Sequence, residues 1–191
     1  MLESLSQFDQ SLFLFINSSL ANPVTDFIMP LVTNDWVLRI LYAAAMVIIL
    51  WRGDSKLRWL VLFSIITLAL TDYISAGYLK PLIARPRPCQ ELAALNLLVG
   101  CGGGFSLPSA HTANSFGQAL LFSFHFRKVG WYLYPVAALI GLSRVFVGVH
   151  YPADVVCGAI LGCLIGVIFA LAFSLFSNRF LKPGGESAVR D

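Results

Sequence analysis

The stretch RWLVLFSIITLALTDYISAGYL, residues 58–79, is long and apolar enough to form a membrane-spanning helix. A bilayer core of roughly 30 Å requires about 20 such residues. The chain continues directly with KPLIARPRPC, residues 80–89, which holds three cations and three prolines. Charges in or beside lipid are costly unless something compensates them. The end of this helix therefore raises the question of whether the cations bind a ligand.

Composition places the whole chain in the membrane class. Hydrophobic residues make up 58% of the 191 residues and charged residues only 12%, whereas about a quarter of a soluble domain is charged. We expect one integral membrane domain over residues 1–191. The net charge of +3 is small and its basic residues are scattered, which argues against nucleic acid as a partner. The first ten residues contain no Lys or Arg, so a cleavable signal is not expected.

The hydrophobic pattern predicts an all-α, polytopic helix bundle. Five stretches are long enough to span: about 35–52, 58–79, 111–127, 130–147 and 154–178. Residues 1–33 are apolar but short and interrupted by prolines, which predicts interfacial or re-entrant helices and allows a sixth span.

Basic residues give this bundle an orientation, because cytoplasmic loops are enriched in Lys and Arg. With five spans, three basic segments fall on one side: the 52–58 turn, Arg127-Lys128, and the tail with Arg179, Lys182 and Arg190. That side is predicted to be cytoplasmic. The 80–110 loop and the 148–153 turn then face the outside, which is the periplasm if the protein sits in a bacterial inner (plasma) membrane.

Four short motifs on the predicted outer side combine cations, histidines and helix starts. They are Lys80 with Arg87-Pro88, Pro108-Ser109-Ala110-His111, Ser143-Arg144, and His150-Tyr151-Pro152-Ala153-Asp154. Arginine offers a planar fork of donors that suits phosphate, and a helix N-terminus offers free N–H groups with a positive dipole. Ser109 suits the N-cap of the following helix. Together these residues predict an anion site.

The two histidines add chemistry to this site. A neutral His150 is a competent nucleophile if Asp154, four residues later, holds its other ring nitrogen. His111 can then protonate the departing oxygen as a general acid. With cations neutralising the transferring group, phosphoryl transfer needs neither a metal nor a cofactor, and we expect none.

The motifs Lys80-x₆-Arg87-Pro88, Pro108-Ser109-Ala110-His111 and Ser143-Arg144-x₅-His150-x₃-Asp154 resemble the three-part signature of the type 2 phosphatidic acid phosphatase family, which also includes vanadium haloperoxidases. The resemblance covers residues 80–154. It implies that His150 forms a phosphohistidine, that Asp154 orients it, and that His111 is the acid and later the base. It also implies that the phosphate oxygens are bound by Lys80, Arg87, Ser109, Ala110 and Arg144. Ala110 stands where the commonest motif has Gly, but its backbone N–H can still donate.

Four further residues lie near these motifs. Arg85 is predicted to be an interfacial or substrate-rim charge rather than a phosphate ligand. Asp72 needs a partner because it lies within the membrane. Arg39 is the first choice by depth, with a link to Lys80 as the second. Cys89 and Cys101 are predicted to form a disulfide if their loop faces an oxidising compartment.

The substrate is less determined than the reaction. A site at the membrane face predicts a phosphorylated membrane lipid, such as undecaprenyl pyrophosphate, phosphatidylglycerol phosphate, phosphatidic acid or a lipid A phosphate. Lipid-to-lipid phosphotransfer and a non-enzymatic anion transporter are the alternatives. The sequence indicates no obligatory protein partner.

Overall fold

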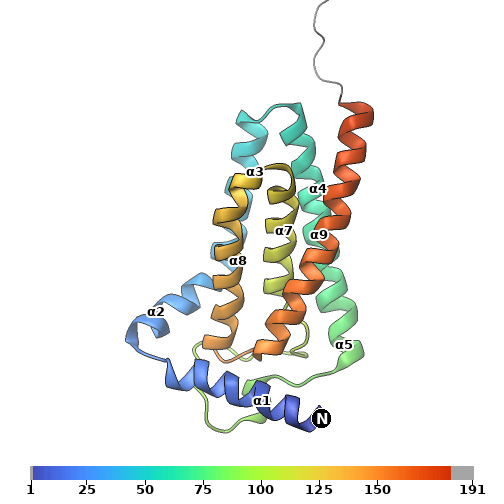
Figure 1. The fold of residues 1–191 in the computed structure, drawn as a ribbon. Helices are drawn as coiled ribbons and strands as arrows, with labels where there is room; N and C mark the ends of the chain where they lie inside the picture. Colours follow the sequence, from blue (N-terminus) through green and yellow to red (C-terminus); the bar gives the residue numbers. More distant parts are fainter. Residues whose placement is uncertain (1, 182–191) are drawn as a thin grey trace, which may run out of the picture.

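The computed structural model describes residues 2–181. Every regular element in this range is helical, and Figure 1 shows their arrangement. In chain order the elements are α1 (Leu2–Leu14), the π-helical turn η1 (Phe15–Ser19), α2 (Pro23–Val32), α3 (Asp35–Arg52), α4 (Ser55–Asp72), the π-helical segment η2 (Tyr73–Leu79), α5 (Lys80–Ile83), α6 (Pro88–Glu91), α7 (Ala110–His125), α8 (Arg127–Phe146) and α9 (Pro152–Phe180). This confirms the predicted all-α class.

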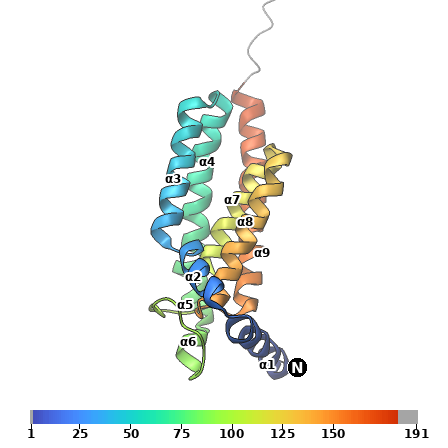
Figure 2. The same cartoon turned by 90° about the vertical axis from the view of Figure 1, so that its left-hand side faces the viewer.

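Five long helices, α3, α4, α7, α8 and α9, stand side by side as a bundle (Figures 1 and 2). Helix α7 lies at its centre and contacts α4, α8 and α9. One end of the bundle holds the α3–α4 and α7–α8 turns and the C-terminal end of α9. The other end holds α1, α2, α5 and the loop before α7. The predicted outer segments therefore gather at one end. Of the predicted cytoplasmic tail, Lys182 and Arg190 lie outside the described residues.

Glycines bring the central helix α7 close to α9. Gly158, Gly162 and Gly166 occur at four-residue intervals on α9, and each faces the backbone of α7. A Cβ on Gly158 would lie 2.5 Å from the carbonyl oxygen of Ser109, and one on Gly166 would lie 2.8 Å from that of Gly117. Small residues at this spacing let membrane helices pack with their backbones nearly in contact. The start of α7 is thereby fixed against the start of α9.

The outside of the bundle is apolar and part of its interior is polar. Large side chains such as Trp131 and Leu175 are exposed on the outside. In the interior, the buried Ser64 of α4 donates a hydrogen bond of 2.5 Å to Oε1 of Gln118 on α7, and Nε2 of Gln118 donates to the Ser64 carbonyl at 3.0 Å. This distribution suits a lipid environment, where polar groups must find hydrogen-bond partners inside the protein.

Three helical segments of the described chain are long and apolar enough to cross a membrane: Ser55–Glu91, Arg127–Phe146 and Pro152–Phe180. The bent N-terminal pair would be a fourth if it counted as one span. Helices also form at the other two predicted spans, but α3 carries Asp35, Arg39 and Arg52, and α7 has only 16 residues. The central position of α7 explains why it can be short and polar. The predicted number of five to six crossings stays a prediction.

The N-terminal region forms the short helices that were predicted for residues 1–33. Helix α1 lies across the end of the bundle, and the chain bends by 113° between the segments Glu3–Ser19 and Pro23–Val32 (Figure 1). Asn17, which is fully buried, donates hydrogen bonds of 2.8 Å to the carbonyl oxygens of Phe146 and Asn96. The carbonyl of Phe146 belongs to the last turn of α8, where backbone acceptors lack partners within the helix. These bonds fasten the N-terminal region to the bundle.

Candidate active site

The starts of α7 and α9 meet at the end of the bundle where α1 lies. The backbone N–H of Ser109, at the N-cap position of α7, donates a hydrogen bond of 3.0 Å to the carbonyl of Asp154 in the first turn of α9. Pro152 opens α9, where a proline costs no hydrogen bond. The predicted histidine motifs are therefore neighbours in space.

His150 and Asp154 form a buried pair just before and within the first turn of α9. Nδ1 of His150 lies 3.4 Å from Oδ2 of Asp154, and both side chains are almost fully buried. The same Oδ2 accepts a hydrogen bond of 2.8 Å from the backbone N–H of Tyr151, so Asp154 also caps its own helix. Because Nδ1 faces the carboxylate, Nε2 is the nitrogen of His150 that is available to a ligand.

Burial lowers the pKa of His150 to about 3. The hydrogen bond to Asp154 opposes this shift, whereas the positive charges of Lys80 and Arg144 add to it. The imidazole is consequently neutral at physiological pH, and its free nitrogen carries an electron pair rather than a proton. A neutral imidazole can attack an electrophile.

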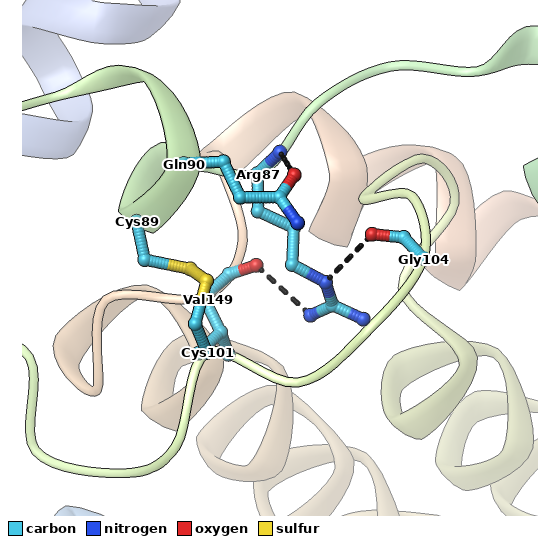
Figure 3. Close-up of a disulfide and its surroundings, with 6 residues drawn as sticks. All are labelled: Arg87, Cys89, Gln90, Cys101, Gly104 and Val149. Carbon is cyan, nitrogen blue, oxygen red and sulfur yellow. Dashed lines mark hydrogen bonds between the residues drawn. A yellow bond between two sulfur atoms is a disulfide. The ribbon is translucent and has the colours of Figure 1, made fainter.

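Arg87 is held by backbone carbonyl groups beside this pair. Its Nε donates to the carbonyl of Gly104 and its Nη1 to that of Val149, both at 3.3 Å (Figure 3). A disulfide between Cys89 and Cys101 lies next to it, with the two Cα atoms 5.9 Å apart. The disulfide links α6, which begins directly after Arg87, to the loop that leads into α7. The guanidinium is thus oriented by groups on both sides of the site.

Lys80 and Arg144 complete a group of three cations around His150. Lys80 begins α5, directly after the π-helical segment η2. Such segments are frequent at functional sites because they rotate the residues that follow. Arg144, near the end of α8, donates from Nη1 to Oγ1 of Thr33 at 2.5 Å. Its buried Nε has no hydrogen-bond partner among residues 2–181, so it is ready to donate to a bound anion.

Ser109 occupies the predicted N-cap position of α7, and Ala110 is the first residue of the helix. The Ser109 hydroxyl is fully buried and accepts a hydrogen bond of 3.0 Å from Thr112. Its own proton can still be donated to an anion. The first N–H groups of α7 have no partner within the helix, which makes this end suitable for a negatively charged oxygen.

His111 follows in the first turn of α7. Its Nε2 lies 2.9 Å from Oδ1 of Asp35, the first residue of α3. The Asp35 side chain is 64% exposed. An exposed carboxylate beside a partly exposed imidazole gives His111 a route for protons from water.

Arg85, predicted to be an interfacial or substrate-rim charge, forms ion pairs with two carboxylates. Its Nη1 donates to Oδ1 of Asp154 at 2.7 Å, and its Nη2 donates to Oδ2 of Asp9 at 2.6 Å. Its guanidinium carbon lies 4.2 Å from the ring centre of Tyr151. Arg85 therefore stands behind Asp154, on the side away from Nε2 of His150. Two carboxylates and an aromatic ring compensate its charge.

The preferred ion pair between Asp72 and Arg39 is not formed. Oδ1 of Asp72 accepts a hydrogen bond of 3.3 Å from Asn114, and the guanidinium of Arg39 lies over the ring of Trp36 at 5.9 Å. Depth in the membrane suggested the pair, but each side chain contacts a different neighbour, Asn114 for Asp72 and Trp36 for Arg39. No hydrogen bond links Asp72 to Lys80 among the described residues.

Three residues around the site lie outside the predicted motifs: Asp9, Thr33 and Asp35. All belong to the first 35 residues, whereas the motifs begin at Lys80. Only the eight-residue spacing between the polar residues Asp9 of α1 and Asn17 of η1 offered a signal, because residues eight apart in a continuous helix lie on nearly the same face. Within residues 2–181 no group of three His, Cys, Asp or Glu side chains gathers as metal ligands. The cations and the start of α7 are the groups positioned to bind an anion.

The comparisons with known proteins agree with the geometry. The model of the PAP2 superfamily matches residues 56–178. A lipid A 4'-phosphatase of Bacteroides thetaiotaomicron is 34% identical over 88% of this chain and 78% of its own length. The undecaprenyl-diphosphatase BcrC of Bacillus subtilis is 31% identical over 88% of this chain and 83% of its own.

A solved structure shows the same fold. The crystal structure of a transmembrane PAP2-type phosphatidylglycerolphosphate phosphatase from Bacillus subtilis matches with a TM-score of 0.73. The match covers 93% of this chain and 89% of that one, at 23% identity. With the candidate spans, it identifies an integral membrane protein. As its three motifs predicted, the chain belongs to the PAP2 superfamily.

Proposed function

We propose that the chain hydrolyses a phosphate from a membrane lipid through a phosphohistidine on His150. It is a phosphoric ester hydrolase, as its named phosphatase relatives are. One observation supports the mechanism: the neutral, buried imidazole of His150 is backed by Asp154 and lies in the field of Lys80 and Arg144, while Arg87 binds the carbonyl of the preceding residue, Val149. A nucleophile and a set of phosphate-binding groups thus share one site.

The first step transfers the phosphoryl group to the enzyme. Nε2 of His150 attacks phosphorus with its electron pair while the bond from phosphorus to the lipid oxygen breaks in line. His111, which takes up a proton when the anionic phosphate binds beside it, gives that proton to the leaving oxygen, and the lipid departs as an alcohol. Asp154 stabilises the imidazolium that forms, as a carboxylate does in other catalytic pairs. The cations and the N–H groups at the start of α7 stabilise the charge on the equatorial oxygens.

The second step returns the enzyme to its starting state. Water attacks the phosphohistidine while His111, now neutral, accepts a proton from it. The bond between phosphorus and Nε2 breaks, inorganic phosphate leaves, and His150 is again neutral. His111 regains the protonated form it needs for the next turnover in the same step. No group outside the chain, other than water, is required by this sequence.

The leaving-group side of the site favours a phosphomonoester over a diphosphate. A monoester releases an alkoxide that needs the proton of His111, whereas a diphosphate releases a lipid phosphate that needs little help and stays anionic. The Asp35 carboxylate lies 2.9 Å from Nε2 of His111 and would repel such an anion. A lipid A type or glycerolipid phosphomonoester is therefore the first candidate. A polyprenyl diphosphate is the second, because BcrC is named for that activity.

The site lies at the end of the bundle that carries α1, opposite the basic α3–α4 and α7–α8 turns. By the distribution of basic residues, we place it on the outer face of a plasma membrane, the periplasmic face in a bacterium with two membranes. A lipid headgroup in that leaflet would lie level with the cations.

A substrate panel at fixed detergent concentration tests the proposal. We expect phosphate release from a lipid phosphomonoester, and none from His150→Ala. The matched control is His125→Ala, which removes a histidine that packs against Phe124 and Phe173, away from the site. A purified protein that releases no phosphate from any lipid, yet moves anions across vesicles, would favour transport. Phosphate transfer to a second lipid without release would favour a phosphotransferase.

A further inference from the structure

Asp9 connects the N-terminal helix α1 to the catalytic pair. It is 8% exposed, and both of its carboxylate oxygens are used. Oδ2 accepts the hydrogen bond from Arg85, and Oδ1 accepts one of 2.9 Å from the backbone N–H of Ala153, in the first turn of α9. Arg85 in turn donates to Asp154, whose other oxygen faces His150. A continuous chain of contacts therefore runs from α1 to the nucleophile.

The charges of the groups that link α1 to His150 affect the proposed reaction. Arg85 lies between two carboxylates, at 2.6 Å from Asp9 and 2.7 Å from Asp154. The three groups together carry one negative charge, which matches the positive charge that His150 acquires when it attacks phosphorus. Without Asp9, Arg85 would neutralise Asp154 alone, and the developing imidazolium would face no net charge. Interactions between buried charges are weakly screened, so this difference in net charge changes the energy of the imidazolium that forms at His150.

Other contacts of α1 are independent of Asp9. Phe13 is fully buried and packs edge-on against the ring of Tyr151, with ring centres 5.4 Å apart. Asn17 is anchored by carbonyl groups at the end of α8 and in the 92–99 loop. The N-terminal region thus has two further attachment points, Phe13 on α1 and Asn17 on η1, and the loss of the Asp9 charge alone should leave α1 in place.

We propose that Asp9 is a positioning residue for catalysis, which acts through Arg85: it balances the guanidinium charge, so that a net negative charge faces His150, and it holds Asp154 aligned with His150. The inference rests on the proposed function, because it assumes that His150 is the nucleophile. It assigns a role in the reaction to an N-terminal helix outside the matched family region, which begins at residue 56.

The test is Asp9→Asn, which keeps the shape and the acceptor for Ala153 but removes the charge opposite Arg85. We expect kcat to fall about tenfold, the lower end of the effect of outer-shell groups that act on a site through the residues they hold. KM should change less than twofold, because Asp9 touches no part of the phosphate site. The control is Glu3→Gln, which removes an exposed negative charge from the same helix and should leave kcat unchanged.

A double-variant cycle separates positioning from mere packing. If Asp9 acts through Arg85, Asp9→Asn should have little further effect on kcat in an Arg85→Gln background. Asp9→Glu, which restores the charge, should recover part of the lost rate. A wild-type kcat for Asp9→Asn, or additive losses in the double variant, would overturn the inference. If His150→Ala keeps its activity, the proposed function itself fails, which is a distinguishable result.

Discussion

Gly158→Ala should damage catalysis without touching a catalytic residue. A Cβ at this position would lie 2.5 Å from the carbonyl oxygen of Ser109 and 3.2 Å from Cβ of Thr112. The first distance is about 1 Å shorter than ordinary van der Waals contact. Both neighbouring atoms lie on or next to the backbone at the start of α7, so the clash cannot be relieved by rotating the end of a flexible side chain. The start of α7 would have to move away from α9.

The effect of that displacement on the rate and on the stability can be estimated. The hydrogen bond from Ser109 to the Asp154 carbonyl, 3.0 Å long, would stretch, and His111 would move relative to His150. A misplacement of about 1 Å at a reacting centre costs on the order of 10²-fold in rate. Overpacking of this kind also costs about 1–3 kcal/mol of stability.

Phosphate release from a lipid phosphomonoester, together with the thermal unfolding midpoint in the same detergent, measures both effects. Gly100→Ala is the matched control, because a Cβ at Gly100 meets nothing within 4 Å. We expect the control to behave like the wild type and Gly158→Ala to lose most of its kcat while it remains folded. Wild-type kcat in a folded Gly158→Ala protein would refute the claim that the α7–α9 contact sets the site geometry.

Three further predictions concern the disulfide, the nucleophile and the absence of a metal requirement. Replacing Cys89 and Cys101 by Ser should lower the free energy of unfolding by about 3 kcal/mol, because the disulfide joins residues 12 apart in sequence; reductant should destabilise the wild type but not the variant. Because burial lowers its pKa to about 3, the imidazole of His150 should stay neutral in a ¹⁵N NMR titration of the free enzyme from pH 7 to 5, whereas an ordinary histidine would protonate near 6.5. Phosphate release should survive EDTA and be inhibited by vanadate, which imitates pentacoordinate phosphorus; loss of activity in EDTA that Mg²⁺ restores would contradict the mechanism.

The sequence predicted the site best where a chemical role requires a fixed spacing between residues. His150 and Asp154 lie four residues apart at a helix start, and Ser109 precedes another, so local geometry alone predicted their roles as a pair and an N-cap. The apolar stretches predicted helices at the correct places. The class of fold and the gathering of the motifs at one end of the bundle followed from these two patterns.

Contacts between distant segments were not predictable. Asp9 reaches Arg85 across 76 residues of chain, and Thr33 reaches Arg144 across 111. Neither sequence separation follows a helical period that would predict the contact. The expected partner of Asp72 was wrong for a related reason: depth was used to choose it, but rotation about the helix axis decides which side chains meet. The number of spans was hard to count because α7 is shielded by its neighbours and needs no apolar surface of its own.

In the proposed mechanism, His150 carries the phosphoryl group between the two steps. Rapid mixing with a lipid phosphomonoester, quenching in alkali and peptide mass spectrometry would test it most directly, because phosphohistidine is stable in alkali. We expect phosphate on the peptide that contains His150, formed at the rate of the first turnover, and none in His150→Ala. Full turnover with no phosphate on that peptide, or an active His150→Ala protein, would contradict it.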